Sequence, residues 1–202
     1  MLPNFQPVPN HALRLRMRRD LRSNAVCGGA ISIAPSMDPS FRDMLSHLGA
    51  AHGRWQRIGR GTALHLALPI THLNQPEHAA HLDAALAGAG MVPENLHLEI
   101  EESAFALGGG VQQALEKLRG RGWQLGLRAS QKPSLALDAR TRTLFSTLVL
   151  QDHAPEAQAQ RVDAAKAAGW AIVLCNRPDE VAPARLIAEG YDAHEARVGP
   201  MG

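Results

Sequence analysis

The chain is poor in cysteine and in aromatic residues, two kinds of residue that often indicate the class of a protein. Its 202 residues include two cysteines, Cys27 and Cys175, and aromatic residues make up 4% of the sequence. Both cysteines lie in apolar runs, so we interpret them as reduced core residues, which excludes a disulfide-rich fold and predicts a cytoplasmic location. No run approaches the length of a membrane span, so no membrane segment is expected within this chain.

An excess of charge of one sign is also missing. The chain has 21 basic and 19 acidic residues, with a net charge of +2. A balance this even creates no field that would attract nucleic acid, so we expect no nucleic-acid partner. The N-terminus shows no signal-peptide pattern. Hydrophobic residues make up 45% of the sequence, which is enough for the core of one domain of this length.

The predicted domain begins with a hairpin that follows a proline-containing tail. Residues 1–12 contain three prolines and are predicted to form a tail or linker, whereas residues 13–202 are predicted to form one domain. Apolar residues and arginines alternate over residues 13–18, which predicts a half-buried strand. The apolar run 25–34 predicts a second strand, paired with the first in antiparallel fashion.

After the hairpin, helix and strand patterns alternate. The predicted helices cover residues 38–55, 74–88, 110–121, 134–139, 155–168 and 179–189, and the predicted strands cover 62–70, 96–101, 123–128, 145–151, 170–175 and 191–194. Such alternation is typical of parallel strands joined by crossover helices. We therefore predict an α/β fold, a (β/α)8-type (TIM-like) barrel of reduced size with an antiparallel first strand. A doubly wound open sheet is the alternative, and the lack of phosphate-loop and GxGxxG motifs weakens its nucleotide-binding versions.

Carboxylates gather at the end of one predicted strand only. In such barrels, chemistry lies at the C-terminal ends of the strands, and Glu99, Glu101 and Glu102 lie there on strand 96–101. A divalent metal requires oxygen ligands from several strands, so we expect no metal site and no cofactor. Arg128 ends the next strand, and we expect it to pair with Glu99, the alternative being two separately solvated groups.

Six segments in consistent order resemble the EAL-type cyclic-di-GMP phosphodiesterase domain. The segment RDLRSNAVCGGAIS resembles the turn and strand that carry the EAL triplet, and ALHLALPITHL resembles the "VNLS" strand. LDAALAGAGMVPENLHLEIEES resembles the approach to "LEITES", and LEKLRGRGWQLGLRAS the approach to "DDFGTG". FSTLVLQ occupies the place of "LKID", and AKAAGWAIVLCNRPDEVAPARLIAEGYD that of "AEGVE". The resemblance covers the chain from about residue 13.

The departures from the family pattern fall on the metal site that the resemblance implies. Glu99 is the one position that retains its acid. The other positions hold substitutes: Gly29 or Ala30 for the EAL glutamate, Pro69 for the asparagine, Arg128 and Ala129 for the aspartate pair, Val149 for the lysine, and Cys175 for the last glutamate. The resemblance therefore implies the fold but a degenerate, non-catalytic domain, or pseudoenzyme.

Three functions are consistent with these observations. The favoured one is a regulatory protein-interaction module in bacterial signalling or motility, with an unknown protein partner. The second is a metal-independent cyclic-di-GMP receptor without hydrolysis, which is disfavoured because the segment after the second strand is too short for the family's phosphate-contacting elements. The third is an enzyme with relocated chemistry that uses Glu99, Glu102 or His153.

The remaining candidate residues are basic. An arginine stripe is either an interaction face for an acidic partner or a charged outer face that protects a strand edge, and it comprises Arg14, Arg16, Arg18, Arg19 and Arg22. No aromatic residue lies between these arginines, which argues against single-stranded nucleic acid. His78 and His81 share a helix face without an evident third metal ligand. His65 and His97 are expected to face the helices or a strand-end pocket.

Overall fold

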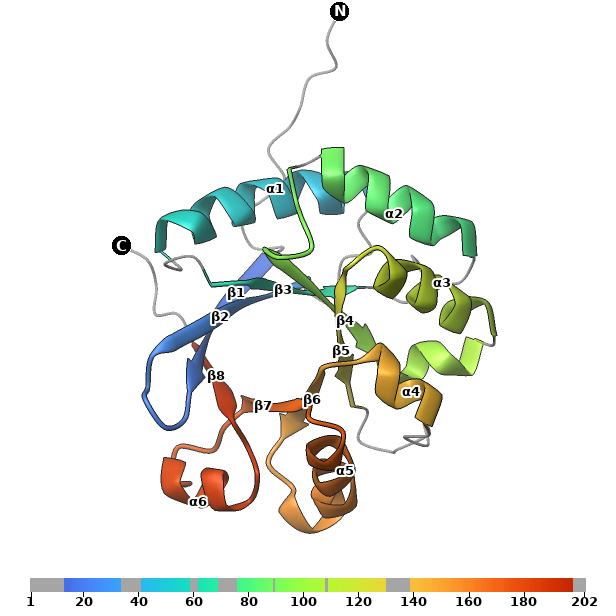
Figure 1. Ribbon diagram of the computed structural model, residues 1–202. Helices are drawn as coiled ribbons and strands as arrows, with labels where there is room; N and C mark the ends of the chain where they lie inside the picture. The colour runs from blue at the N-terminus through green and yellow to red at the C-terminus, as the bar shows by residue number, and fades with distance from the viewer. Residues whose placement is uncertain are drawn as a thin grey trace, which may run out of the picture.

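The strands form a closed ring that is surrounded by helices (Figure 1). The computed structural model describes residues 13–33, 41–58, 62–68, 76–88, 90–107, 109–129 and 139–197. The predicted tail over residues 1–12 and the substituted position Pro69 lie outside these ranges. The division into tail and domain thus stays a prediction.

Eight strands make the barrel, and they follow one another around it in sequence order. Their bounds are β1 Leu13–Asp20, β2 Val26–Ile33, β3 Leu64–Leu68, β4 Leu96–Glu101, β5 Gln124–Arg128, β6 Thr147–Asp152, β7 Ala171–Asn176 and β8 Ala193–Arg197. Strand β1 is antiparallel to both of its neighbours, β2 and β8, whereas the other pairs are parallel. The predicted barrel with an antiparallel first strand is confirmed.

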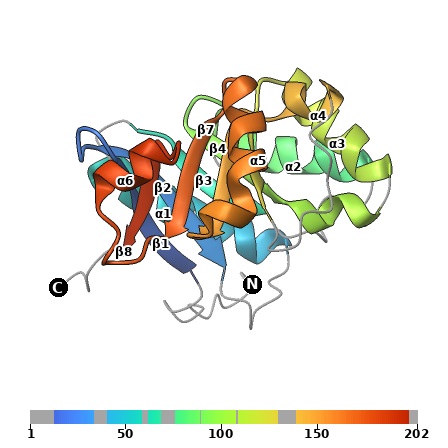
Figure 2. The same cartoon turned by 90° about the horizontal axis from the view of Figure 1, so that it is seen from below.

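Helices lie on the outside of this ring, as the two views show together (Figures 1 and 2). They are α1 Phe41–Ile58, α2 Pro76–Gly88, α3 Gly109–Gly120, α4 Ala139–Leu144, α5 Pro155–Ala167 and α6 Pro183–Ala188, with a short 3-10 helix η2 at Glu102–Leu107. The main core fills the space between strands and helices, where Leu66 of β3 and Leu82 of α2 are fully buried. Within the described ranges, no helix is both long and apolar enough to cross a membrane.

Glycines end several of the helices where the chain turns back into a strand. Gly122, Gly169 and Gly190 follow α3, α5 and α6, and each has a positive φ. Glycine adopts this backbone conformation without the steric cost that a side chain adds. These turns are the signals that located the helix ends in the sequence.

Three local predictions are wrong. The helix predicted at 134–139 is not among them, because residues 130–138 lie outside the described ranges and only Ala139, the first residue of α4, lies within them. Helix α6 starts at Pro183 rather than at 179, because proline lacks the N–H that a helix interior requires. The last strand, predicted at 191–194, is Ala193–Arg197, since its pairing with β1 extends it. Cys27 is exposed and therefore not a core residue.

The interior of the barrel is polar on one side and apolar on the other. On β1, Leu15 and Met17 pack outward against the main core, so the arginines between them face inward. Strands β6 to β8 contribute a small separate apolar cluster to the interior, formed by Val149, Val173, Cys175 and Ala193. The buried charges described below occupy the rest.

Candidate functional site

Glu99 lies inside the barrel on β4 and is 1% exposed. Its Oε2 accepts a hydrogen bond from Arg128 Nη1 at 2.6 Å, and its Oε1 lies 2.6 Å from Arg18 Nη2. The predicted pair with Arg128 is therefore confirmed. Strand pairing explains it, because Glu99 is level with Gly126 and its neighbour Glu101 is level with Arg128.

Arg18 is the residue that sequence reasoning misplaced. Its side chain is buried, and its Nη2 donates to Glu195 Oε1 at 2.8 Å as well as lying against Glu99. The hypothesis of an outer interaction face is wrong for Arg18, because the closing pair of β1 with β8 sets Arg18 level with Glu195. Strict alternation along β1 was the available signal, but it did not reveal which face pointed inward.

The other arginines of the stripe do not share one face. Arg16 is partly buried, lies 3.6 Å from Glu195, and donates to Asn176 Oδ1 at 3.4 Å. Arg19 donates to the carbonyl of Asn24 in the hairpin turn, and Arg22 is exposed. The side chain of Arg14 lies outside the described part of the structure. The stripe is thus divided between the barrel interior and the hairpin surface.

The buried charges stabilise one another. Burial by itself raises the pKa of the Glu99 carboxyl, but the charge of Arg18, with that of Arg128 in addition, holds it well below its ordinary value. Burial lowers the pKa of Arg18, and the charges of Glu99 and Glu195 more than offset it, so Arg18 stays protonated. Two buried atoms, Arg18 Nη1 and Glu99 Oε1, nonetheless have no hydrogen-bond partner among the described residues. The Arg18–Glu99 contact is therefore a close ion pair.

Two histidines line the same part of the interior. His65 Nδ1 lies 3.4 Å from Glu99 Oε1, and the His65 and His97 rings meet edge to face with centroids 4.7 Å apart. Burial, reinforced by the charge of Arg18, lowers the pKa of His65 to about 4. His65 is therefore neutral at physiological pH. The expectation that it faces the helices or a strand-end pocket is wrong, since it faces Glu99 inside the barrel.

The structure decides between Gly29 and Ala30. A Cβ added to Gly29 would lie 2.8 Å from the ring of Trp55 on α1, so Gly29 faces the helix layer. A Cβ added to Gly28 would meet His65 in the interior, and Ala30 shares that face because strand side chains alternate. Ala30 thus holds the inward position where the resemblance implies a glutamate.

The remaining substituted positions are apolar and buried. Val149 and Cys175 belong to the interior apolar cluster, and burial raises the pKa of the Cys175 thiol to about 12. Ala129 belongs instead to the core beneath the helices, and its N–H donates to the carbonyl of Val149. None of these side chains offers an oxygen ligand.

The donor set does not fit a metal ion. Among the residues that the structure describes, no three side chains of His, Cys, Asp or Glu converge as metal ligands. Both oxygens of Glu99 already face guanidinium groups, which repel a divalent cation. The described part of the interior can hold its own charges in place, but its residues do not form the oxygen cage that metal-assisted hydrolysis requires.

The other candidate residues are dispersed. Glu102 begins η2 and forms a buried ion pair with Arg161 of α5. His153 pairs with Glu189 across the ends of β6 and α6. His81 is exposed, and the side chain of His78 lies outside the described part.

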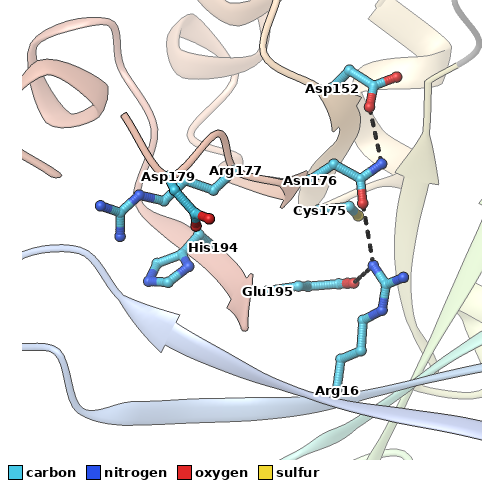
Figure 3. Close-up of a pocket in the computed structure, with 8 residues that line it drawn as sticks. All are labelled: Arg16, Asp152, Cys175, Asn176, Arg177, Asp179, His194 and Glu195. Atoms are coloured by element: carbon cyan, nitrogen blue, oxygen red, sulfur yellow. Dashed lines mark hydrogen bonds and ion pairs between the residues drawn. The ribbon is translucent and has the colours of Figure 1, made fainter. Parts of the chain in front are cut away.

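A polar cavity of about 760 Å³ lies near the ends of β6, β7 and β8, beside the ion pairs that Arg16 and Arg18 make with Glu195 (Figure 3). It is lined by Arg16, Asp152, Cys175, Asn176, Arg177, Asp179, His194 and Glu195. Two hydrogen bonds connect lining residues: Arg16 Nη1 donates to Asn176 Oδ1, and Asn176 Nδ2 donates to Asp152 Oδ1 at 2.9 Å. Glu99 does not line the cavity, so the opening is separate from the one surviving acid.

Comparison with known proteins supports the barrel assignment. No protein-family model matches the chain, and no curated protein matches it. Solved structures do match, among them the EAL domain of Mycobacterium smegmatis DcpA, with a TM-score of 0.73 and 18% identity over 91% of this chain and 90% of that one. The chain has the fold of an EAL domain.

Two further structures with the EAL fold carry ligands. The phosphodiesterase PaMucR in complex with c-di-GMP has a TM-score of 0.70 and 15% identity over 91% of this chain and 93% of its own. The EAL enzyme Bd1971, bound to cAMP and cyclic di-GMP, has a TM-score of 0.67 and 12% identity over 92% of this chain. This chain spans 61% of the length of Bd1971. At these identities the likeness concerns the fold alone.

Proposed function

We propose that this chain is a non-catalytic domain with the EAL fold that regulates bacterial signalling or motility by binding another protein. One observation supports the proposal above all others. Glu99, the acid that survives where the resemblance implies a metal site, has a guanidinium group 2.6 Å from each of its oxygens. A divalent ion would have to displace both groups.

The energetics of this arrangement support a structural role for Glu99. Moving both arginines away from this buried carboxylate would leave its charge uncompensated, and breaking one buried pair costs about 3–5 kcal/mol. The other two carboxylates of the cluster, Glu195 and Glu101, are themselves paired with Arg18 and Arg128. The substituted positions Ala30, Val149 and Cys175 add no carboxylate that could serve as a metal ligand. The chain retains the EAL fold, whereas the negative charge of Glu99 is compensated by arginines and is not available to a metal ion that would activate water.

The surface of the described residues constrains the kind of partner. Val92 is the single large hydrophobic side chain that is exposed in those ranges. Stable, obligate interfaces are rich in apolar area, whereas transient ones are more polar. A partner that binds the described surface therefore does so through polar contacts, which suits a regulatory interaction.

A cyclic-di-GMP receptor without hydrolysis is the second candidate. The polar cavity at the ends of β6 to β8 supplies the volume that such a receptor needs without metal ions, whereas the carboxylates in its lining count against an anionic ligand. PaMucR and Bd1971, which share the fold, are solved with that dinucleotide bound.

Incubation of the chain with cyclic di-GMP and Mg²⁺ or Mn²⁺ tests the main proposal. We expect no linear dinucleotide above the no-protein background, with an active EAL phosphodiesterase as the positive control. Product formation that disappears in the Glu99→Gln variant would overturn the proposal. Calorimetry with the same ligand, with and without Mg²⁺, separates the second candidate, since metal-independent binding at about micromolar Kd would favour the receptor.

A further inference from the structure

The cavity near the ends of β6 to β8 has a charge imbalance that the ion-pair cluster beside it does not have. The cluster is electrically balanced, since three arginines and three glutamates form one connected chain: Arg16, Arg18, Arg128, Glu99, Glu101 and Glu195. The remaining charged side chains of the lining are Arg177, Asp152 and Asp179. The carboxylates therefore outnumber the guanidinium groups among the lining charges that the cluster leaves over.

The contacts of these three residues leave both aspartates without a cationic partner in the described part of the chain. Asp152 accepts a hydrogen bond from the neutral amide of Asn176, and Asp179 has no ion pair or hydrogen bond to any residue that the structure describes. Arg177 donates through Nε and Nη2 to the carbonyl of Val181, so its fork is turned toward its own loop. Both aspartates are exposed at the opening and free to meet a ligand.

The histidine in the lining does not restore the balance. Burial, with the charge of Arg177 in addition, lowers the pKa of His194 below its ordinary value. His194 is therefore neutral at pH 7 and contributes no positive charge to the cavity. It can still donate or accept one hydrogen bond there.

We propose that this cavity binds an alkylguanidinium or alkylammonium group, with Asp152 and Asp179 as its acceptors. Figure 3 shows the two aspartates at separate places of the lining, one beside Asn176 and the other beside His194 and Arg177. Each position offers carboxylate acceptors to a group with several N–H donors. The inference rests on the proposed function and deepens it, since an arginine or lysine side chain of a partner protein carries this chemistry.

The same charges disfavour an anionic ligand. A phosphate group needs free donors, and part of the donor set is already occupied: Arg16 Nη1 contacts Glu195 and Asn176, and Arg177 Nε and Nη2 donate to the carbonyl of Val181. Two exposed carboxylates would repel its charge in addition. A cyclic dinucleotide, which carries two phosphates, is therefore a poorer ligand for this cavity than a cation.

Titration of the intact chain with agmatine, followed by calorimetry, tests the proposal. A capped arginine peptide forms the second arm, because it presents the same group on a protein backbone. We expect saturable binding of both probes, weakened about tenfold or more by the Asp152→Asn/Asp179→Asn pair. The matched control is Glu156→Gln/Asp163→Asn, which removes the same charge from exposed positions of α5 outside the lining, and we expect it to change the affinity by less than about twofold.

Each outcome decides a point. Binding of the peptide at least as tight as that of agmatine supports a partner side chain, whereas binding of agmatine alone supports a free small molecule. No saturable binding of either probe, or an equal loss in the α5 control, would overturn the proposal, as would preferential binding of inorganic phosphate. The single Asp179→Asn variant guards against misfolding, because that side chain has no hydrogen bond to lose. The hydrolysis assay is independent of all these results, so a failure here does not count against the absence of catalysis.

Discussion

Replacing Glu99 by glutamine tests the buried ion-pair cluster most directly. The substitution keeps the size and shape of the side chain but removes the charge that faces Arg18 and Arg128 at 2.6 Å each. Arg18 would keep Glu195 as its carboxylate partner, and Arg128 would keep the partly exposed Glu101 at 3.2 Å. The interior would thus hold excess positive charge that water cannot solvate.

The expected loss follows from the burial of the three groups. Removing one partner of a buried ion pair destabilises a protein by about 3–5 kcal/mol, and Glu99 has two such partners. A domain is stable by about 5–15 kcal/mol in total, so the variant should be close to its limit of stability. With a urea m-value of about 2 kcal/mol/M, the unfolding midpoint falls by about 1.5–2.5 M.

Urea unfolding followed by circular dichroism measures this loss, and Glu101→Gln is the matched control. The Glu101 side chain also pairs with Arg128 but is 42% exposed, so its loss should cost less than about 1 kcal/mol. Combining Glu99→Gln with Arg128→Met should recover about 1–3 kcal/mol relative to the sum of the single effects, because the second change removes an unpaired charge. A Glu99→Gln loss no larger than that of Glu101→Gln would refute the reasoning.

Three further predictions concern a histidine, a glycine and the two cysteines. The pKa of His65 is about 4 in the folded chain against about 6.5 unfolded, so protonation favours unfolding, and lowering the pH from about 7.5 to 5.5 should cost about 1.3 kcal/mol that a His65→Asn variant does not lose. A flat stability profile in both proteins would contradict this. Gly29→Ala would set a Cβ 2.8 Å from the Trp55 ring and should destabilise by about 1–3 kcal/mol in thermal unfolding, whereas an unchanged Tm would be inconsistent with the packing. Cys27 should react with a thiol reagent in the folded protein while Cys175, whose pKa is raised to about 12, reacts only after unfolding, as mass spectrometry of labelled peptides can show; equal labelling of both would contradict the burial of Cys175.

Much of the fold could be predicted because its signals are local. The alternation over residues 13–18, the apolar runs of the parallel strands, and the glycines after α3, α5 and α6 each depend on a few adjacent residues. The errors concern bounds that depend on strand pairing, as in β8, or on a proline, as at the start of α6. Strand β8 reads as polar, since His194, Glu195 and Arg197 interrupt it, and only its pairing with β1 makes it a strand.

The site was predictable in part for a related reason. The Arg128–Glu99 pair follows from adjacent parallel strands of known order. Arg18 and Glu195 could not be placed in the same way, because they are 177 positions apart and meet only where the barrel closes. A stripe of arginines on a strand is ordinarily an exposed face, and here the two-residue period alone did not distinguish inside from outside.

The mutual dependence of the buried charges also limits how this barrel can change. Glu99 pairs with both Arg18 and Arg128, so exchanging Glu99 leaves each guanidinium with one carboxylate partner fewer in a medium of low polarity. Placing an aspartate at Arg128 would bring a second carboxylate beside Glu99 with Arg18 as the one close cation left to both, and replacing Arg18 would leave Glu195 without its closest partner. A metal-binding version of this interior therefore lies several substitutions away. Single substitutions that remove one partner of these pairs are expected to lower the stability of the protein before they could create a metal site.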